Sequence, residues 1–238
     1  MIGPPQWVLD LADAFWQLAG SPQPQPGALR QAIARALPLA IVFLPNLSLR
    51  AVRERLQRCH VKLLEQESDR PLRGCLFVGN EIGFIFVDGT DPDDEQRFST
   101  AHELSHYLRD YWQPRCLAIK YLGEGIKEVF DGLRPATPSE RIHAILQRVP
   151  LGYHAHLMHR VDDDLPLEIA ASEDEADRLA FELLAPAQAV WQKLGNDCSS
   201  SQLIGLLRNT FGLPARQAHD YAALLKPTVT HPLLELLG

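Results

Sequence analysis

The residues of this chain best suited to metal chemistry are two histidines and a glutamate. They lie in the segment His102-Glu103-Leu104-Ser105-His106. On a helix, residues four apart lie about one turn apart on nearly the same face, so both imidazoles can bind one Zn²⁺. Glu103 then points toward the fourth coordination position, where a zinc-bound water would lie. We therefore expect His102 and His106 to be metal ligands and Glu103 to be the general base.

A third protein ligand must come from elsewhere, because a hydrolytic zinc site keeps three protein ligands and one open position. Residues 172–184 predict a helix, and at about 100° per residue Glu173 and Asp177 fall inside its apolar arc. Carboxylates in an apolar stripe are costly unless a cation or hydrogen-bond donors receive them. We predict Glu173 as the third ligand and Asp177 as the acceptor of a ligand-histidine N–H. Glu175 is expected to pair with Ser172 in a capping box at the start of this helix.

Several histidines are rival third ligands, and the sequence does not choose among them. They are His143, His154, His156 and His159. His154 and His156 would share a face on a strand but not on a helix. A histidine of this region could instead stabilise the oxyanion of the tetrahedral intermediate, which makes His154, His156 and Tyr153 candidates for that role. Tyr107 is a weaker candidate for the same role.

The elements expected to position these residues are helices around a small β-sheet. Apolar spacing predicts helices over residues 7–19, 28–37, 48–58, 92–110, 138–148 and 172–184, with one or two more over 200–225 broken at 212–214. A buried strand is expected over 39–44 and a hairpin over 74–78 and 82–87. The histidine-bearing helix is expected to end before Pro114. An extended substrate would lie along the edge of the strand at 82–87.

Length and composition place the chain among ordinary globular proteins. It has 238 residues, 46% of them hydrophobic and 22% charged, enough for one well-buried domain with an appendage. We expect an N-terminal helix and proline-rich linker (1–27), a catalytic domain (28–195) and a C-terminal helical segment (196–238). The predicted fold class is α+β, a mostly helical domain with the hairpin at 74–88 beside the histidine-bearing helix.

Charge, cysteines and hydropathy exclude several classes of protein. The net charge of −7 repels phosphate, so no direct binding of nucleic acid is expected. The four cysteines are too widely spaced to suggest a disulfide framework or a cysteine zinc site. The longest apolar stretch, residues 36–44, is too short to span a bilayer, and the N-terminus lacks the basic region of a secretory signal. We therefore expect a cytoplasmic protein that does not bind membranes.

Two blocks of the sequence resemble the ImmA/IrrE family of metallopeptidases, whose pattern reads roughly RFTxAHELGH and then ExEA(N/D)xFAxxLLMP. The matching blocks are residues 97–107 and 173–186, with Ser105 where the family usually has glycine and Ala185 where it has methionine. The resemblance implies a zincin fold with thermolysin-like ligation, with zinc on His102, His106 and Glu173 and with Glu103 as base. The better understood members are cytoplasmic proteases that cleave helix-turn-helix repressors and so switch on stress or mobile-element genes.

The hypothesis that follows is a zinc-dependent endopeptidase. It would hydrolyse a peptide bond of a protein substrate, a helix-turn-helix transcriptional repressor by the resemblance, through Glu-assisted attack of a zinc-bound water. The alternative is a regulatory module that contains zinc and binds a repressor without cutting it. A third hypothesis is a zinc hydrolase acting on a non-peptide amide, but an edge strand facing the site favours a peptide.

Overall fold

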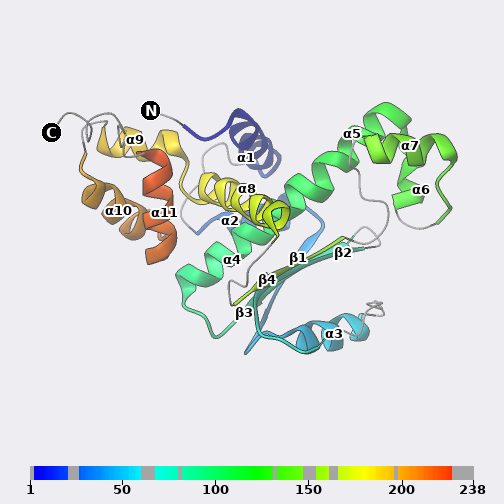
Figure 1. Ribbon diagram of the computed structural model, residues 1–238, viewed down its shortest axis with the longest axis horizontal. Coiled ribbons are helices and arrows are strands. Elements are labelled where there is room, and N and C mark those ends of the chain that lie inside the picture. Colours follow the sequence, from blue (N-terminus) through cyan, green and yellow to red (C-terminus); the bar gives the residue numbers. More distant parts are fainter. Residues whose placement is uncertain are drawn as a thin grey trace.

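The computed structural model shows helices gathered around one small sheet (Figure 1). It describes residues 3–20, 27–59, 68–79, 82–130, 133–146, 154–160, 166–195 and 198–226. The strands are β1 (Leu39–Leu44), β2 (Leu72–Gly79), β3 (Ile82–Asp88) and β4 (His154–His159). The α-helices are α1 (Gln6–Leu18), α2 (Leu29–Ala36), α3 (Leu49–Arg58), α4 (Asp93–His106), α5 (Gln113–Leu122), α6 (Lys127–Phe130), α7 (Pro138–Leu146), α8 (Leu167–Leu184), α9 (Ala187–Leu194), α10 (Ser200–Asn209) and α11 (Ala215–Leu225). None of these helices is both long and apolar enough to cross a membrane.

The sheet has the strand order β1-β3-β2-β4, with β1 parallel to β3 and the other pairs antiparallel. The predicted hairpin is confirmed as β2 and β3, and the α+β class is confirmed with it. The expectation that a substrate lies along the strand at 82–87 is wrong, because β3 is paired on both sides. Among the described residues the edges of this sheet are β1 and β4, so these two strands offer backbone groups for a further strand.

The two faces of the sheet pack against different helices, as Figure 1 shows with α4 and α8 on one side and α3 on the other. Side chains alternate between the faces along each strand. In β2, Leu76 and Val78 join the main core under α4, whereas Cys75 and Phe77 join the smaller core under α3. The main core also contains side chains of α1, α10 and α11. The N-terminal and C-terminal helices therefore pack into the same core as the sheet.

Helix α4 begins directly after Pro92, and its first turn carries Asp93, Asp94 and Glu95, whose charge suits the positive end of the helix dipole. The expected end before Pro114 is wrong. The chain continues from α4 through one π-helical segment, η1 (Tyr107–Trp112), into α5. Pro114 lies in the first turn of α5, at the junction with η1, where it adds no N–H to the continuing helix.

Helix α8 begins at Leu167, not at Ser172, so the expected capping box of Ser172 and Glu175 is wrong. Pro166 occupies the N-cap position, and its fixed φ suits the entry into a helix. The earlier start places Glu173 inside a formed helix. The other helices that the sequence predicted lie within a few residues of their expected bounds, and the break at 212–214 is confirmed between α10 and α11. Helices α5, α6 and α9 were not predicted.

The segment between the two motif blocks combines a helical unit with a strand. Helices α5, α6 and α7 bury a small apolar cluster of their own, at the upper right of Figure 1. The chain then returns to the sheet as β4, which pairs with β2. This strand brings a segment distant in sequence under α4.

Asp88 ties the end of β3 to the end of β4. Its carboxylate is 1% exposed and accepts the backbone N–H of Asn46 (3.1 Å), Leu47 (3.0 Å) and Thr90 (2.9 Å). The hydroxyl of Thr90 donates to it at 2.7 Å, and the guanidinium of Arg160 donates as well. Burial alone would raise the pKa of Asp88, but these hydrogen bonds outweigh it and hold the pKa below its usual range.

Asp88→Asn should therefore lower the free energy of unfolding by about 2–4 kcal/mol, since it leaves a buried site with several donors and no charge. Because the folded pKa is depressed, this stabilisation is present above the ordinary carboxyl pKa and is lost as the pH falls through the folded value. Urea denaturation at pH 7 measures the loss. Asp13→Asn, an exposed control, should change stability by less than about 0.5 kcal/mol. Equal stabilities of the two variants would contradict the anchoring role of Asp88.

Candidate metal centre

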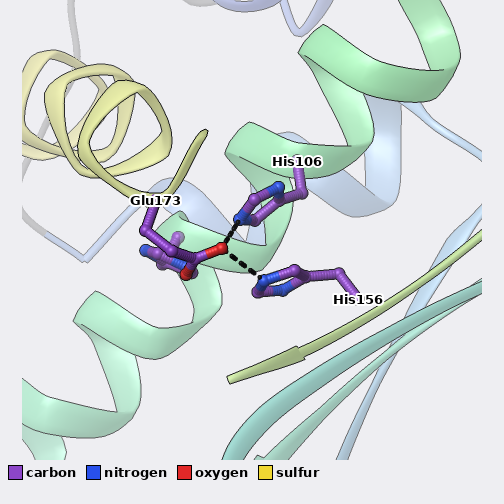
Figure 2. Close-up of side chains that lie close together, drawn as sticks. His106, His156 and Glu173 are labelled. Carbon is purple, nitrogen blue, oxygen red and sulfur yellow. Dashed lines mark hydrogen bonds and ion pairs between the residues drawn. The ribbon is translucent and has the colours of Figure 1, made fainter. Parts of the chain in front are cut away.

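Four side chains from three elements converge between α4, α8 and the sheet. They are His102, His106, His156 and Glu173, and one ligand atom from each lies within 4.8 Å of the others. Figure 2 shows Glu173 reaching from α8 toward His106 and His156, which come from α4 and β4. This group could hold a metal ion.

Helix α4 supplies His102 and His106, each 2% exposed. Their Nε2 atoms face the carboxylate of Glu173. His102 Nε2 lies 3.2 Å from one oxygen, and His106 Nε2 lies 3.5 Å from the other. The four-residue spacing thus places both imidazoles on one side of the helix, as the sequence predicts, and the predicted third ligand meets them there.

The register of β4 selects His156 from the rival histidines. His156 pairs with Leu76 of β2, so its side chain lies on the face of the sheet that α4 covers. Its Nε2 is 2.9 Å from Glu173, and its Nδ1 is 2.9 Å from Oε2 of Glu103. His154 lies on the same face but two residues away, where its ring approaches Tyr111 at 6.4 Å between centroids.

The other candidates do not join this group. His159 ends β4 and lines an adjoining cleft, whereas Tyr107 is buried in the main core against Tyr111. Tyr153 lies outside the described residues, and the side chain of His143 is likewise not described. Among the described candidates for an oxyanion stabiliser, His156 is therefore the one that lies at the cluster.

Each of the three histidines directs Nδ1 to a carboxylate and turns Nε2 inward. His102 Nδ1 is 2.7 Å from Asp177, the acceptor that the helix projection predicts. His106 Nδ1 is 2.9 Å from Asp110. Sequence reasoning missed Asp110, although its spacing four residues after His106 was the available signal. Such outer carboxylates orient metal-binding imidazoles and fix the nitrogen that faces the metal.

Arg109 joins the two helical parts of the site and was also missed. Its guanidinium donates to Asp110 at 2.6 and 2.8 Å, and to the carbonyl and hydroxyl oxygens of Ser172 at 2.8 and 2.6 Å. It also lies 3.4 Å from Glu175. Since Ser172 directly precedes Glu173, this one side chain fixes both the partner of His106 and the turn of α8 that carries Glu173.

Glu103 is fully buried against the sheet at Gly74. A Cβ at position 74 would lie 2.8 Å from Glu103 Oε1, so the close approach requires glycine there. Oε1 of Glu103 and Nε2 of His106 have no hydrogen-bond partner among the described residues. Such buried atoms cost about 1–3 kcal/mol each and are found at functional sites. Inward imidazole nitrogens beside a carboxylate oxygen match the ligand set of a divalent metal such as zinc.

The protonation of the cluster reflects its buried charges. Burial disfavours the cation of His102, but hydrogen bonds to Asp177 and Glu173 outweigh it and raise the pKa to about 10. Glu103 and Glu173 likewise outweigh burial at His156 and raise its pKa to about 9. At His106, burial and the positive charges of the two neighbouring imidazolium groups outweigh the hydrogen bond with Asp110 and lower the pKa to about 4. The pKa of Glu173 is held well below its usual range despite burial, by hydrogen bonds from His102 and His156.

Asp177→Asn should weaken metal binding by about 10–100-fold, because it removes the carboxylate that orients His102. Competition with a chromogenic zinc chelator measures the affinity. Asp174→Asn is the matched control, since Asp174 lies on the same helix and is exposed. Equal affinities of the two variants would show that Asp177 does not orient the ligand.

Metal uptake should release protons, because ligand imidazoles must be neutral. At pH 7 the raised pKa values keep His102 and His156 protonated and leave His106 neutral. Zinc held by His102, His106 and Glu173 should release about one proton, and about two if His156 also binds. Affinity should fall about tenfold per pH unit for each released proton as the solution is acidified. Calorimetry in buffers of different ionisation enthalpy gives the count, and His219→Ala, an exposed control, should not alter it. No proton release would contradict the assigned protonation.

Comparison with family models and with curated proteins does not identify this chain. No family model matches it, and no curated protein matches it. The resemblance to the ImmA/IrrE pattern therefore rests on the two sequence blocks at 97–107 and 173–186 alone. Histidines of the first block and the glutamate that opens the second lie together in the structure.

Proposed function

We propose that this protein is a zinc-dependent endopeptidase. The observation that carries the proposal is Glu103, a fully buried carboxylate beside the cluster of His102, His106, His156 and Glu173. One of its oxygens keeps no partner among the described residues, at a cost that a purely structural role would not require. A general base needs a carboxylate in such a position.

Each residue of the site has a separate role in this mechanism, according to its position. His102, His106 and Glu173 would hold the zinc ion, which supplies Lewis acidity toward a carbonyl and a water molecule when bound. Glu103 takes up the proton of the attacking water and passes it to the leaving amine. His156, held by Glu103 through Nδ1, directs Nε2 toward the reacting carbonyl and stabilises the developing oxyanion.

A peptide substrate is favoured by the position of β4. This edge strand forms one wall of a cleft of about 480 Å³ that reaches His102, His156 and Glu173. Since β4 is an edge among the described strands, an extended peptide could pair with its outer side and so pass the cluster with its backbone fixed. By the resemblance to the ImmA/IrrE family, the substrate is a helix-turn-helix repressor.

A second candidate function is a regulatory module that contains zinc and binds a repressor partner without cutting it. Its support is the common pattern of the three histidines. His156 has a carboxylate on Nδ1 and an inward Nε2, as His102 and His106 do. If all three imidazoles and Glu173 bound the ion, four protein ligands would fill a tetrahedral site and leave no open position.

Glu103→Gln should lower peptide cleavage by about 10²–10⁴-fold without loss of zinc, because it removes the base and keeps the shape of the side chain. The measurement is mass spectrometry of a mixed peptide library incubated with zinc-loaded protein, together with the zinc content of each variant. Cleavage at the wild-type rate by Glu103→Gln would overturn the mechanism.

His156→Ala separates the two candidate functions. In an endopeptidase it should reduce cleavage and leave zinc bound, whereas in a closed site it should sharply reduce the zinc content. His154→Ala is the matched control, because His154 lies on the same face of β4 outside the cluster. A wild-type protein that cuts no peptide, combined with loss of zinc from His156→Ala, would favour the regulatory module.

A further inference from the structure

Helix α11 forms one wall of the cleft beside the metal centre. Arg216, Gln217 and Asp220 of this helix line the cleft, which also reaches His102 and Glu173. The helix belongs to the predicted C-terminal segment, which the sequence separates from the catalytic domain. In the structure, side chains of α11 belong to the main core that also contains side chains of α4 and α8. This part of the C-terminal segment therefore contributes to the site.

A row of aromatic rings that begins at the metal centre holds α11 in place. The ring of Phe98, one turn before His102 on α4, lies 6.3 Å from the imidazole of His102 between centroids. Phe98 lies 5.6 Å from Phe181 of α8, and Phe181 stacks on Tyr221 of α11 at 4.7 Å. Figure 1 shows α11 beside α8, as this stacking requires. Because a close-packed core resists displacement, α11 keeps a fixed position relative to the metal centre.

Gln217 carries an unsatisfied polar group at this wall. It lies one turn before Tyr221 on α11 and is 7% exposed. Its oxygen Oε1 is buried and has no hydrogen-bond partner among the described residues. The hydroxyl of Tyr221 donates to Glu182 at 3.2 Å and so does not serve Gln217. Because an unpaired buried amide destabilises the folded protein, its place at the wall of a cleft indicates a partner that binds there.

The chemistry of this side chain indicates a peptide as the partner. A glutamine oxygen accepts hydrogen bonds, and its NH₂ group donates them. A peptide backbone offers the complementary donors and acceptors at almost every residue. The last torsion angle of glutamine is broad, so Gln217 can turn its amide toward the cleft at small cost. Residues 155–160 of β4 line the same cleft, so a peptide extended along this strand lies in the cleft that Gln217 borders.

We propose that Gln217 binds the substrate, with Oε1 accepting a backbone N–H of the peptide in the cleft. This inference rests on the proposed endopeptidase function and assigns to α11 a part in holding the substrate. A contact with the backbone is independent of the side chains of the substrate, so it fixes the path of the chain past the metal centre. Since the aromatic row holds α11 in place, Gln217 is positioned before the substrate arrives.

Gln217→Leu tests the unpaired amide, since leucine is close to glutamine in size and has no polar side-chain atom. Without peptide, the variant should unfold at a urea concentration about 0.3–1 M higher than wild type. Its zinc content should not change, because Gln217 lies outside the metal cluster. Gln192→Leu is the matched control, because Gln192 is an exposed residue of α9 outside the cleft. The control should change neither the urea midpoint nor the zinc content.

Peptide binding tests the partner. The probe is a fluorescent peptide that zinc-loaded Glu103→Gln protein retains from the mixed library, and its anisotropy reports the affinity. Adding Gln217→Leu should weaken binding about tenfold, and adding Gln192→Leu should not. Ester analogues of the peptide, each with one backbone N–H replaced by oxygen, locate the contact. One ester should weaken binding about tenfold when Gln217 is present and less than about twofold when it is replaced.

The outcomes separate this inference from the function on which it rests. Peptide cleavage combined with equal affinities of the Gln217→Leu and Gln192→Leu proteins would leave the endopeptidase standing and overturn the role of Gln217. A lower urea midpoint in Gln217→Leu, or an ester penalty that survives this substitution, would also overturn it. Binding that depends on Gln217, without cleavage by wild type, would support the contact and count against the endopeptidase. If no library peptide is retained and none is cut, both proposals fall.

Discussion

The burial of a polar stretch of α4 is the constraint on which the rest of this structure depends. The nine residues 98–106 are all buried, and most of them carry polar side chains. The hydroxyls of Thr100 and Ser105 donate to carbonyl oxygens of their own helix, at 2.7 and 2.8 Å. The imidazoles of His102 and His106 and the carboxylate of Glu103 have no such hydrogen-bond partner within α4. Burying them without partners would cost much free energy. Other elements must therefore bring charges to α4.

The topology of the molecule meets that requirement from three sides. Helix α8 contributes Glu173 and Asp177, the π-helical segment contributes Asp110, and β4 contributes His156. The sheet has no side chain at Gly74, and this leaves room for Glu103 to lie against β2. The strand order matters for the same reason, since β4, paired with β2, places the imidazole of His156 under α4 and is an edge strand among the described residues.

Sequence reasoning found the parts of the site that depend on helix periodicity and missed the parts that depend on pairing between distant segments. Spacing alone brings out His102 and His106, and it places Glu173 and Asp177 on one face, because a helix fixes these relations locally. His156 stayed one rival among several, because its role depends on the register of β4 against β2, which nothing local determines. The start of α8 was misplaced because Ser172 carries a capping signal that the preceding turns and Pro166 override.

Glu103 stands where the two candidate functions diverge. Burial disfavours a charged His156, but the negative charge of Glu103 and its hydrogen bond, with that of Glu173, outweigh burial and favour the imidazolium. Glu103 holds Nδ1 of His156, so Nε2 either donates a hydrogen bond to a substrate oxygen as an imidazolium or binds the ion after releasing its proton, as His102 must. A bound cation favours the neutral ring. The carboxylate that would serve as base is thus also the group that orients His156, and the proton on Nε2 of His156 distinguishes the two candidate functions.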